Sequence, residues 1–165
     1  MLGISRLVWM SAVALLTTSA SAVMAATATN TFQSKIVIVA ECKVQSTQDL
    51  DFGSHGVLDA NVDATADIGV QCTNTTPYNV QLNAGSTSGG SIATRLMTSG
   101  SATVAYQMYK DAGRSQNWGQ TNGTDTVSAT GNGSVQTHTV YGRVAPQATP
   151  APATYTDTVT VTVEY

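Results

Sequence analysis

Hydrophobic and polar residues alternate along several stretches of the chain, most clearly at its C-terminus. There one set of alternate positions holds Val159, Val161, Val163 and Tyr165, and threonines and Glu164 lie between them. Because successive side chains of a β-strand point to opposite faces, this pattern predicts a strand with one face toward a core. The same period recurs in residues 68–72, 78–82 and 104–108, and less regularly in residues 137–144. These stretches are predicted to be half-buried strands.

Residues that favour turns gather between the alternating stretches. They occupy residues 53–56, 83–91, 111–115, 122–125, 131–133 and 146–152. The composition agrees, because the chain has 26 threonines and 15 serines but only three lysines, a profile that disfavours helices and suits strands. Many short strands without a convincing helix predict an all-β fold, a β-sandwich of the immunoglobulin-like type.

The first 25 residues have the three-part layout of a secretory signal. Arg6 supplies a positive charge, residues 7–16 are apolar except for Ser11, and small residues follow up to a cleavage position near Ala25. The alternative is an uncleaved membrane anchor, although the apolar stretch is short for a membrane span. We therefore expect residues 1–25 to be a signal peptide and the mature protein to be exported.

The only two cysteines, Cys42 and Cys72, lie in the exported part of the chain. An even number of cysteines in an oxidising compartment predicts one disulfide, and two unpaired buried thiols are the alternative. No metal site is expected, because the sequence has no C-x-x-C motif. The two histidines, His55 and His138, also lie far apart with no cluster of ligands nearby.

Charge and motifs exclude several classes of function. Only 10% of the residues are charged and the formal net charge is −3, so the chain lacks the basic patch of a nucleic-acid-binding protein. No nucleophile elbow and no phosphate-binding loop is present. Asp49 and Asp51 stand beside a turn and are expected to be solvated loop acids. We therefore expect neither an enzyme nor a protein with a cofactor.

One aromatic group could bind a ligand. Trp118, together with Tyr106 and Tyr109, could form a flat platform for a sugar ring, and packing in the core is the alternative for the same side chains. The platform would make the protein a self-contained secreted carbohydrate-binding module.

The segment that follows the signal, residues 26–40, is rich in threonine, isoleucine and valine and is strongly β-prone. Phe32, Ser34, Ile36 and Ile38 fall on one face of the predicted strand. The segment has two interpretations. It can be the first strand of the chain's own sandwich, or an extension that joins the sheet of another molecule.

Several sequence stretches from Cys42 to the end resemble the spore coat protein U family, to which the pilins of archaic (Csu-type) chaperone–usher pili belong. They are Leu50-Asp51-Phe52-Gly53, Gly69-Val70-Gln71-Cys72, residues 77–85, Arg95-Leu96-Met97, residues 106–111, Trp118-Gly119, Thr139-Val140-Tyr141-Gly142 and residues 155–163. Their order and spacing carry the resemblance, because no single stretch is diagnostic.

The resemblance implies an immunoglobulin-like sandwich that lacks its last strand and occupies residues 40–165. Residues 26–39 are then a donor strand, with Phe32, Ser34, Ile36 and Ile38 filling the groove of the next identical or related subunit. A periplasmic chaperone is expected to contact Val159, Val161, Val163 and Tyr165, and an outer-membrane usher to assemble the fibre. The implied function is a structural subunit of a cell-surface pilus for adhesion and biofilm formation.

Overall fold

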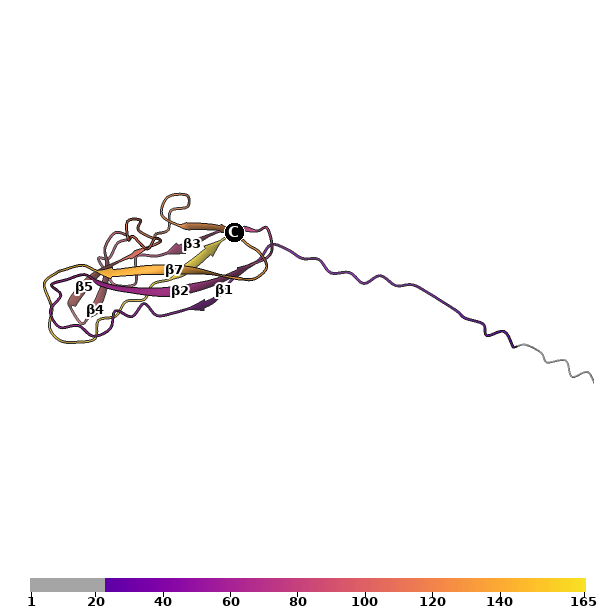
Figure 1. The fold of residues 1–165 in the computed structure, drawn as a ribbon, viewed down its shortest axis with the longest axis horizontal. Helices are drawn as coiled ribbons and strands as arrows, with labels where there is room; N and C mark the ends of the chain where they lie inside the picture. The colour runs from indigo at the N-terminus through magenta and orange to yellow at the C-terminus, as the bar shows by residue number, and fades with distance from the viewer. Residues whose placement is uncertain (1–22) are drawn as a thin grey trace, which may run out of the picture. The chain divides into compact units, whose positions relative to one another are not determined.

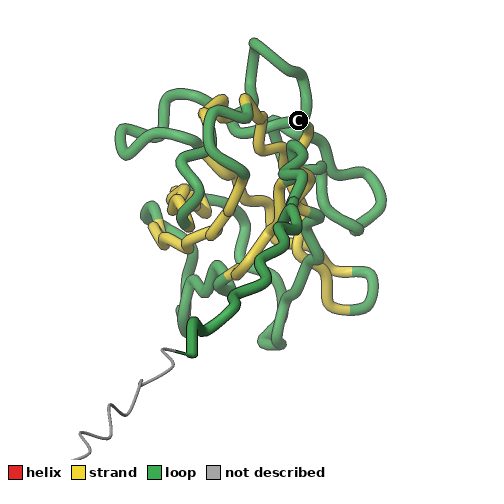
Figure 2. Tube along the Cα trace, turned by 90° about the vertical axis from the view of Figure 1, so that its right-hand side faces the viewer, coloured by secondary structure: helices red, strands yellow, loops and turns green. Residues whose placement is uncertain are grey.

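The computed structural model of the protein describes residues 23–165. Most of the predicted signal peptide, residues 1–22, therefore lies outside the described residues. Residues 37–165 form one compact unit. All regular elements of the described residues are strands, and Figure 2 shows them in yellow between green loops. The predicted all-β class is confirmed.

Residues 23–165 contain eight strands. Figure 1 shows their arrangement. They are β1 (Cys42–Thr47), β2 (Val62–Cys72), β3 (Pro77–Leu82), β4 (Arg95–Ser99), β5 (Ala102–Tyr109), β6 (Val127–Thr130), β7 (Val135–Val144) and β8 (Val161–Glu164). The alternation in the sequence predicted β2, β3, β5, β7 and β8. It gave no separate signal for β1, β4 and β6, which are short.

The strands form two antiparallel sheets. One sheet has the order β1-β2-β7-β5-β4, and the other has the order β6-β3-β8. The longest ladder joins β2 to β7, from Val62 opposite Val144 to Gln71 opposite Val135. Figure 1 shows these two strands side by side, with β1 along the outer side of β2. The arrangement is a β-sandwich, as predicted.

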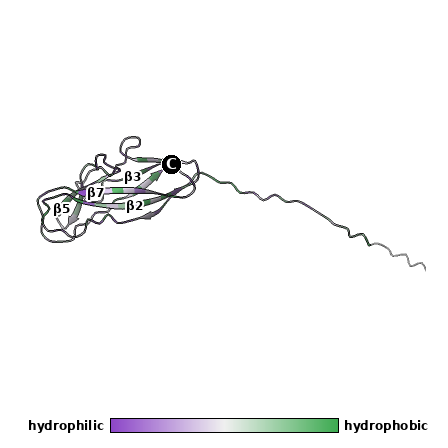
Figure 3. Cartoon of the chain, in the orientation of Figure 1, coloured by the Kyte–Doolittle hydropathy of each residue, from purple (hydrophilic) through white to green (hydrophobic). Residues whose placement is uncertain are grey.

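The core consists of the apolar positions that the alternation selected. Strands β2, β3 and β5 each contribute three consecutive inward-facing residues, and β7 and the loop before β6 complete the cluster. The buried residues are Ile68, Val70, Cys72, Tyr78, Val80, Leu82, Val104, Tyr106, Met108, Trp118, Val140 and Val144. Figure 3 shows the alternation of hydropathy along β7 as a change of colour.

The last strand is shorter than the sequence predicted, because β8 begins at Val161. The predicted alternation is present, since Val159, Val161 and Val163 are half-buried and the threonines between them are exposed. Tyr165 differs from the prediction, because 59% of it is exposed. The register explains this difference. The last residue of β8 with a partner on β3 is Glu164, so Tyr165 lies beyond the ladder.

Residues 26–40, predicted to be β-prone, form no strand in this structure. An isolated extended segment has no backbone partner to hydrogen-bond, and a strand without neighbours is not stable in water. The structure thus assigns no strand to residues 26–40, and the extension in another molecule's sheet stays a prediction.

The predicted disulfide between Cys42 and Cys72 is present. It joins residues that stand directly opposite each other in the β1–β2 ladder. The bond therefore fixes the first strand of the sandwich to the end of β2, whose Cys72 side chain lies in the core. Closing a loop between cysteines 30 residues apart restricts the unfolded chain.

We predict that the Cys42→Ser/Cys72→Ser variant loses about 3–4 kcal/mol of the free energy of unfolding, because its unfolded chain is no longer cross-linked. Urea denaturation followed by circular dichroism measures this loss. Dithiothreitol should shift the wild-type midpoint toward that of the variant and leave the variant unchanged. Equal midpoints for oxidised wild type and variant would contradict the prediction.

Candidate assembly interface

Two edge strands of different sheets lie near each other on one side of the sandwich. Among the strands of residues 23–165, β1 is hydrogen-bonded only to β2, and β8 only to β3. The two strands nevertheless approach each other in space. Unpaired backbone groups along such edges are a template for another strand. We call β1, β8 and the neighbouring Val159 the open edge.

Apolar side chains at the open edge are only partly covered. Val159, Val161 and Val163 pack against the buried core yet remain half-buried. Val44 of β1 is 41% exposed. The polar side of β8 is held differently, because the Gln81 side-chain amide donates to the Glu164 carboxylate at 2.8 Å. The open edge therefore combines free backbone groups with core side chains that lack part of their cover.

The loop between β1 and β2 contributes further half-buried residues, Leu50, Phe52 and Leu58. The Phe52 ring meets the ring of Tyr106 edge-on at a centroid distance of 6.0 Å. Leu50 and Phe52 press against Gly142 of β7, where an added Cβ would lie 2.7 Å from a Leu50 methyl carbon. The loop can pack this closely against β7 only because residue 142 has no side chain.

Residues 26–39, which precede the sandwich, expose a run of large apolar side chains. Phe32 is 90% exposed, Ile36 81% and Ile38 71%, and Ser34 between them is also exposed. Val37 and Val39 are exposed as well. A run of large apolar side chains in water marks an interaction site or an aggregation-prone segment. We call residues 26–39 the N-terminal extension.

A carboxylate holds the chain just before β8. Asp157 Oδ1 accepts hydrogen bonds from the backbone amides of Ser86 and Thr87 at 2.9 and 3.1 Å, and Oδ2 accepts one from Tyr106 Oη at 2.8 Å. Burial opposes ionisation of this carboxyl, but the hydrogen bonds outweigh burial and lower the pKa of Asp157. Burial is also the main reason why the pKa of Tyr106 is raised.

A fully buried arginine lies beside this group. Arg95 of β4 donates to four backbone carbonyl oxygens, those of Leu82, Asn83, Ile92 and Trp118, at 2.8–3.2 Å. Burial lowers the pKa of its guanidinium. Sequence reasoning missed the structural role of Arg95, although the residue belongs to one of the stretches that carry the family resemblance.

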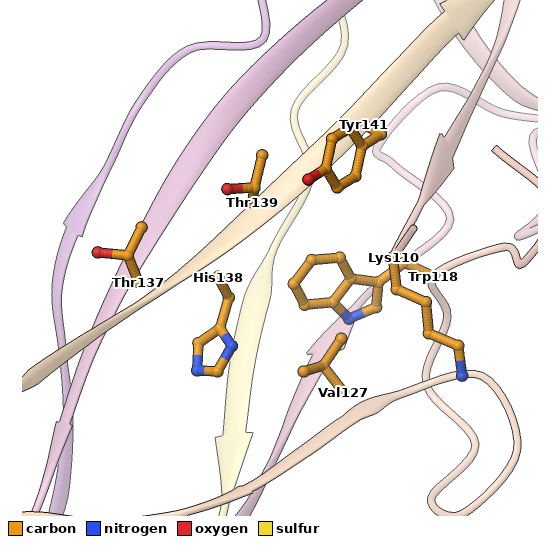
Figure 4. A pocket seen from close by; sticks show the side chains of 7 residues that line it. All are labelled: Lys110, Trp118, Val127, Thr137, His138, Thr139 and Tyr141. Carbon is orange, nitrogen blue, oxygen red and sulfur yellow. The ribbon is translucent and has the colours of Figure 1, made fainter. Parts of the chain in front are cut away.

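Trp118 does not form the platform for a sugar ring that the sequence allowed. The indole is fully buried, and its Nε1–H donates to the carbonyl oxygen of Val80 at 2.8 Å. The indole lines a pocket of about 200 Å³ together with Lys110, His138 and Tyr141 (Figure 4). His138 Nε2 lies 2.9 Å from Tyr78 Oη, and burial lowers the pKa of this histidine. Trp118 belongs to the core, the alternative that the sequence left open.

Residues 23–165 contain no group of three or more His, Cys, Asp or Glu side chains that could hold a metal ion. His55, which we did not expect to bind a metal, has its Nε2 atom 2.6 Å from the carbonyl oxygen of Phe52. Asp51 accepts from the backbone amide of Gly53 at 2.8 Å, as a loop acid does. In the same residues no helix is long and apolar enough to cross a membrane.

The protein is therefore an all-β sandwich that has an open edge and carries an N-terminal extension with exposed apolar side chains. The sequence profile of the Spore Coat Protein U domain matches residues 28–162, so the chain belongs to this family. The match includes most of the N-terminal extension as well as the sandwich. No curated protein matches the sequence.

A solved structure has a similar fold. It is a chain of the CsuC–CsuE chaperone–tip adhesion subunit pre-assembly complex from the archaic chaperone-usher Csu pili of Acinetobacter baumannii. The sequences are 28% identical, and the TM-score is 0.56. The similarity covers 78% of the present chain but only 40% of the other chain.

We predict that Asp157 contributes to the acid sensitivity of the protein. Because its pKa is lowered in the folded state, ionised Asp157 stabilises the fold above its unfolded pKa of about 3.9, and this contribution disappears as the pH falls through the lower folded value. Asp157→Asn should therefore be less stable than wild type at neutral pH, and the difference should narrow below about pH 4. Urea denaturation across the acid range measures both curves.

Tyr106→Phe is the matched variant, because it keeps the ring in the core and removes one hydrogen bond to the carboxylate. Tyr106→Phe should raise the folded pKa of Asp157. Its free energy of unfolding should therefore fall less than that of the wild type as the pH drops below about 4. Stability curves of wild type and Asp157→Asn that stay parallel down to pH 2 would contradict the prediction.

Proposed function

We propose that the protein is a structural subunit of a chaperone–usher pilus that polymerises by donor-strand exchange. The observation that carries the proposal is the presence of two unsatisfied surfaces in one chain. The N-terminal extension exposes Phe32, Ile36 and Ile38, and the open edge leaves Val159, Val161 and Val163 half-buried. The N-terminal extension has apolar side chains without cover, and the open edge has core side chains that another strand could cover.

The energetics support an exchange between subunits. Burial of each of the three large side chains contributes roughly 1.5–3 kcal/mol, before the backbone hydrogen bonds of a new ladder are added. Ordering the extension opposes this gain. Before this ordering cost is subtracted, the gain from the three side chains, roughly 5–9 kcal/mol, is comparable with the stability of a small domain. We therefore expect a filled edge to be more stable than an open one.

The N-terminal extension and β8 of the open edge lie near opposite ends of the sequence, so we expect copies to associate through two different surfaces. An extension that enters the open edge of the next copy makes a head-to-tail contact. Contacts of this type form rings or open filaments rather than simple dimers. We infer that each subunit receives one strand and donates one, and that the product is a fibre.

An open subunit must be protected before assembly, because a bare edge beside exposed core residues invites nonspecific pairing. We propose that a periplasmic chaperone covers β8 through Val159, Val161, Val163 and Tyr165, and that an outer-membrane usher then exchanges it for the next extension. The similar chain comes from a chaperone–subunit pre-assembly complex, which supports a chaperone as partner. The fibre would reach the cell surface and serve adhesion and biofilm formation, a non-enzymatic role.

The test replaces the apolar face of the N-terminal extension in the full chain. Phe32→Asp/Ile36→Asp should reduce head-to-tail association more than 100-fold, since about 3–6 kcal/mol of apolar burial is lost and two charges would enter the groove. Size-exclusion chromatography with light scattering measures the association. The fold should be unchanged, because both side chains are exposed in the single chain.

Thr31→Asp/Gln33→Asp is the matched control, with the same added charge on the opposite face of the predicted strand. It should still form chains of subunits. A synthetic peptide of residues 26–41 should bind the Phe32→Asp/Ile36→Asp variant in a one-to-one complex, because that variant can receive a strand but not donate one. Equal association by the two double variants would show that the proposal is wrong.

A further inference from the structure

We propose that Asp157 is a positioning residue that holds β8 in place to receive a donor strand. The inference rests on the proposed function. Asp157 acts through the strand that follows it. We call the carboxylate and its partners Gly85, Ser86, Thr87 and Tyr106 the clasp.

The clasp joins three parts of the fold. Besides the two backbone amides of the loop after β3, Asp157 Oδ1 accepts from the hydroxyls of Ser86 and Thr87 at 3.1 and 3.2 Å. It also accepts from the amide of Thr158 at 2.9 Å. Oδ2 reaches the Tyr106 hydroxyl on β5, in the other sheet. One side chain therefore fixes the chain before β8 to both layers of the sandwich.

The Asp157 carboxylate packs closely against Gly85. The φ of Gly85, +88°, lies in the region that favours glycine. An added Cβ would also overlap the Asp157 carboxylate. The backbone conformation and the close approach of the carboxylate therefore both require glycine at this position.

The clasp lies where the chain passes from one sheet to the other. One residue before it, Thr156 exchanges two backbone hydrogen bonds with Thr98 of β4, at 2.8 and 3.1 Å. Three residues after it, the amide of Thr160 donates to Asn83 Oδ1 at 2.9 Å, and the amide of Asn83 donates to the carbonyl oxygen of Thr160 at 3.2 Å. Residues 156–160 are thus held at three successive points.

These contacts have a consequence for the open edge. β8 is only four residues long and has one hydrogen-bonded neighbour, so its own ladder provides little to fix its register. A slip by one residue would turn the valines toward solvent and the threonines toward the core. The clasp prevents this slip, although it lies outside the groove that the donor strand would fill. The valines of β8 therefore face the core before a donor strand binds.

The experiment uses the full chain with Phe32→Asp/Ile36→Asp, which receives a strand but does not donate one, and a fluorescent peptide of residues 26–41. Adding Asp157→Ala should weaken peptide binding at least tenfold in fluorescence anisotropy. Hydrogen exchange should lose protection at residues 158–164 and keep it in β2 and β7. Asp157→Asn keeps one acceptor oxygen for the loop amides. Its affinity for the peptide should therefore lie between those of the parent and of Asp157→Ala.

Asp111→Asn is the matched control, because Asp111 also accepts hydrogen bonds from loop amides, those of Ser115 and Gln116. It should bind the peptide as the parent does. Unchanged binding by Asp157→Ala, or a loss of protection spread evenly over all strands, would overturn the positioning role. A parent that does not bind the peptide would instead overturn the proposed function, and exchange at residues 158–164 would still decide whether Asp157 holds β8.

Discussion

The structure depends on one constraint, the burial of the apolar face of a last strand that has a hydrogen-bonded neighbour on one side only. β8 places its valines against the core, yet no strand of residues 23–165 covers its outer edge. Backbone groups and apolar side chains at such an edge are both more stable when paired. In the proposed fibre, the β-prone N-terminal extension with its exposed apolar face would meet this need in a second copy.

The disulfide and the polar groups keep the incomplete sandwich ordered. The Cys42–Cys72 bond ties β1, the other strand of the open edge, to the end of β2. In the proposed fibre a pulling force would enter the domain at Cys42, directly after the extension, and the bond would carry this force into a central ladder. Arg95 of β4 and Asp157, just before β8, hold the loop after β3 through hydrogen bonds to its backbone.

The core strands could be predicted because their residues alternate with a period of two, which is a local property of the sequence. Residues 68–72, 78–82 and 104–108 were predicted in this way and are buried as expected. The short strands β4 and β6 gave no such signal, because five and four residues are too few to establish a period of two. Trp118 was ambiguous for a different reason, because its sequence neighbours do not reveal that Val80 accepts a hydrogen bond from its indole.

The sequence by itself determined the all-β class, the disulfide, the core faces of the long strands and the apolar face of residues 32–38, because each depends on local composition or on a simple count. Only the tertiary structure decided that residues 26–40 form no strand within their own chain and that β8 stays half-covered. It alone also revealed that Arg95 is buried and that Asp157 clasps both sheets. These features depend on which backbone atoms come together in space, and no local pattern in the sequence encodes such contacts.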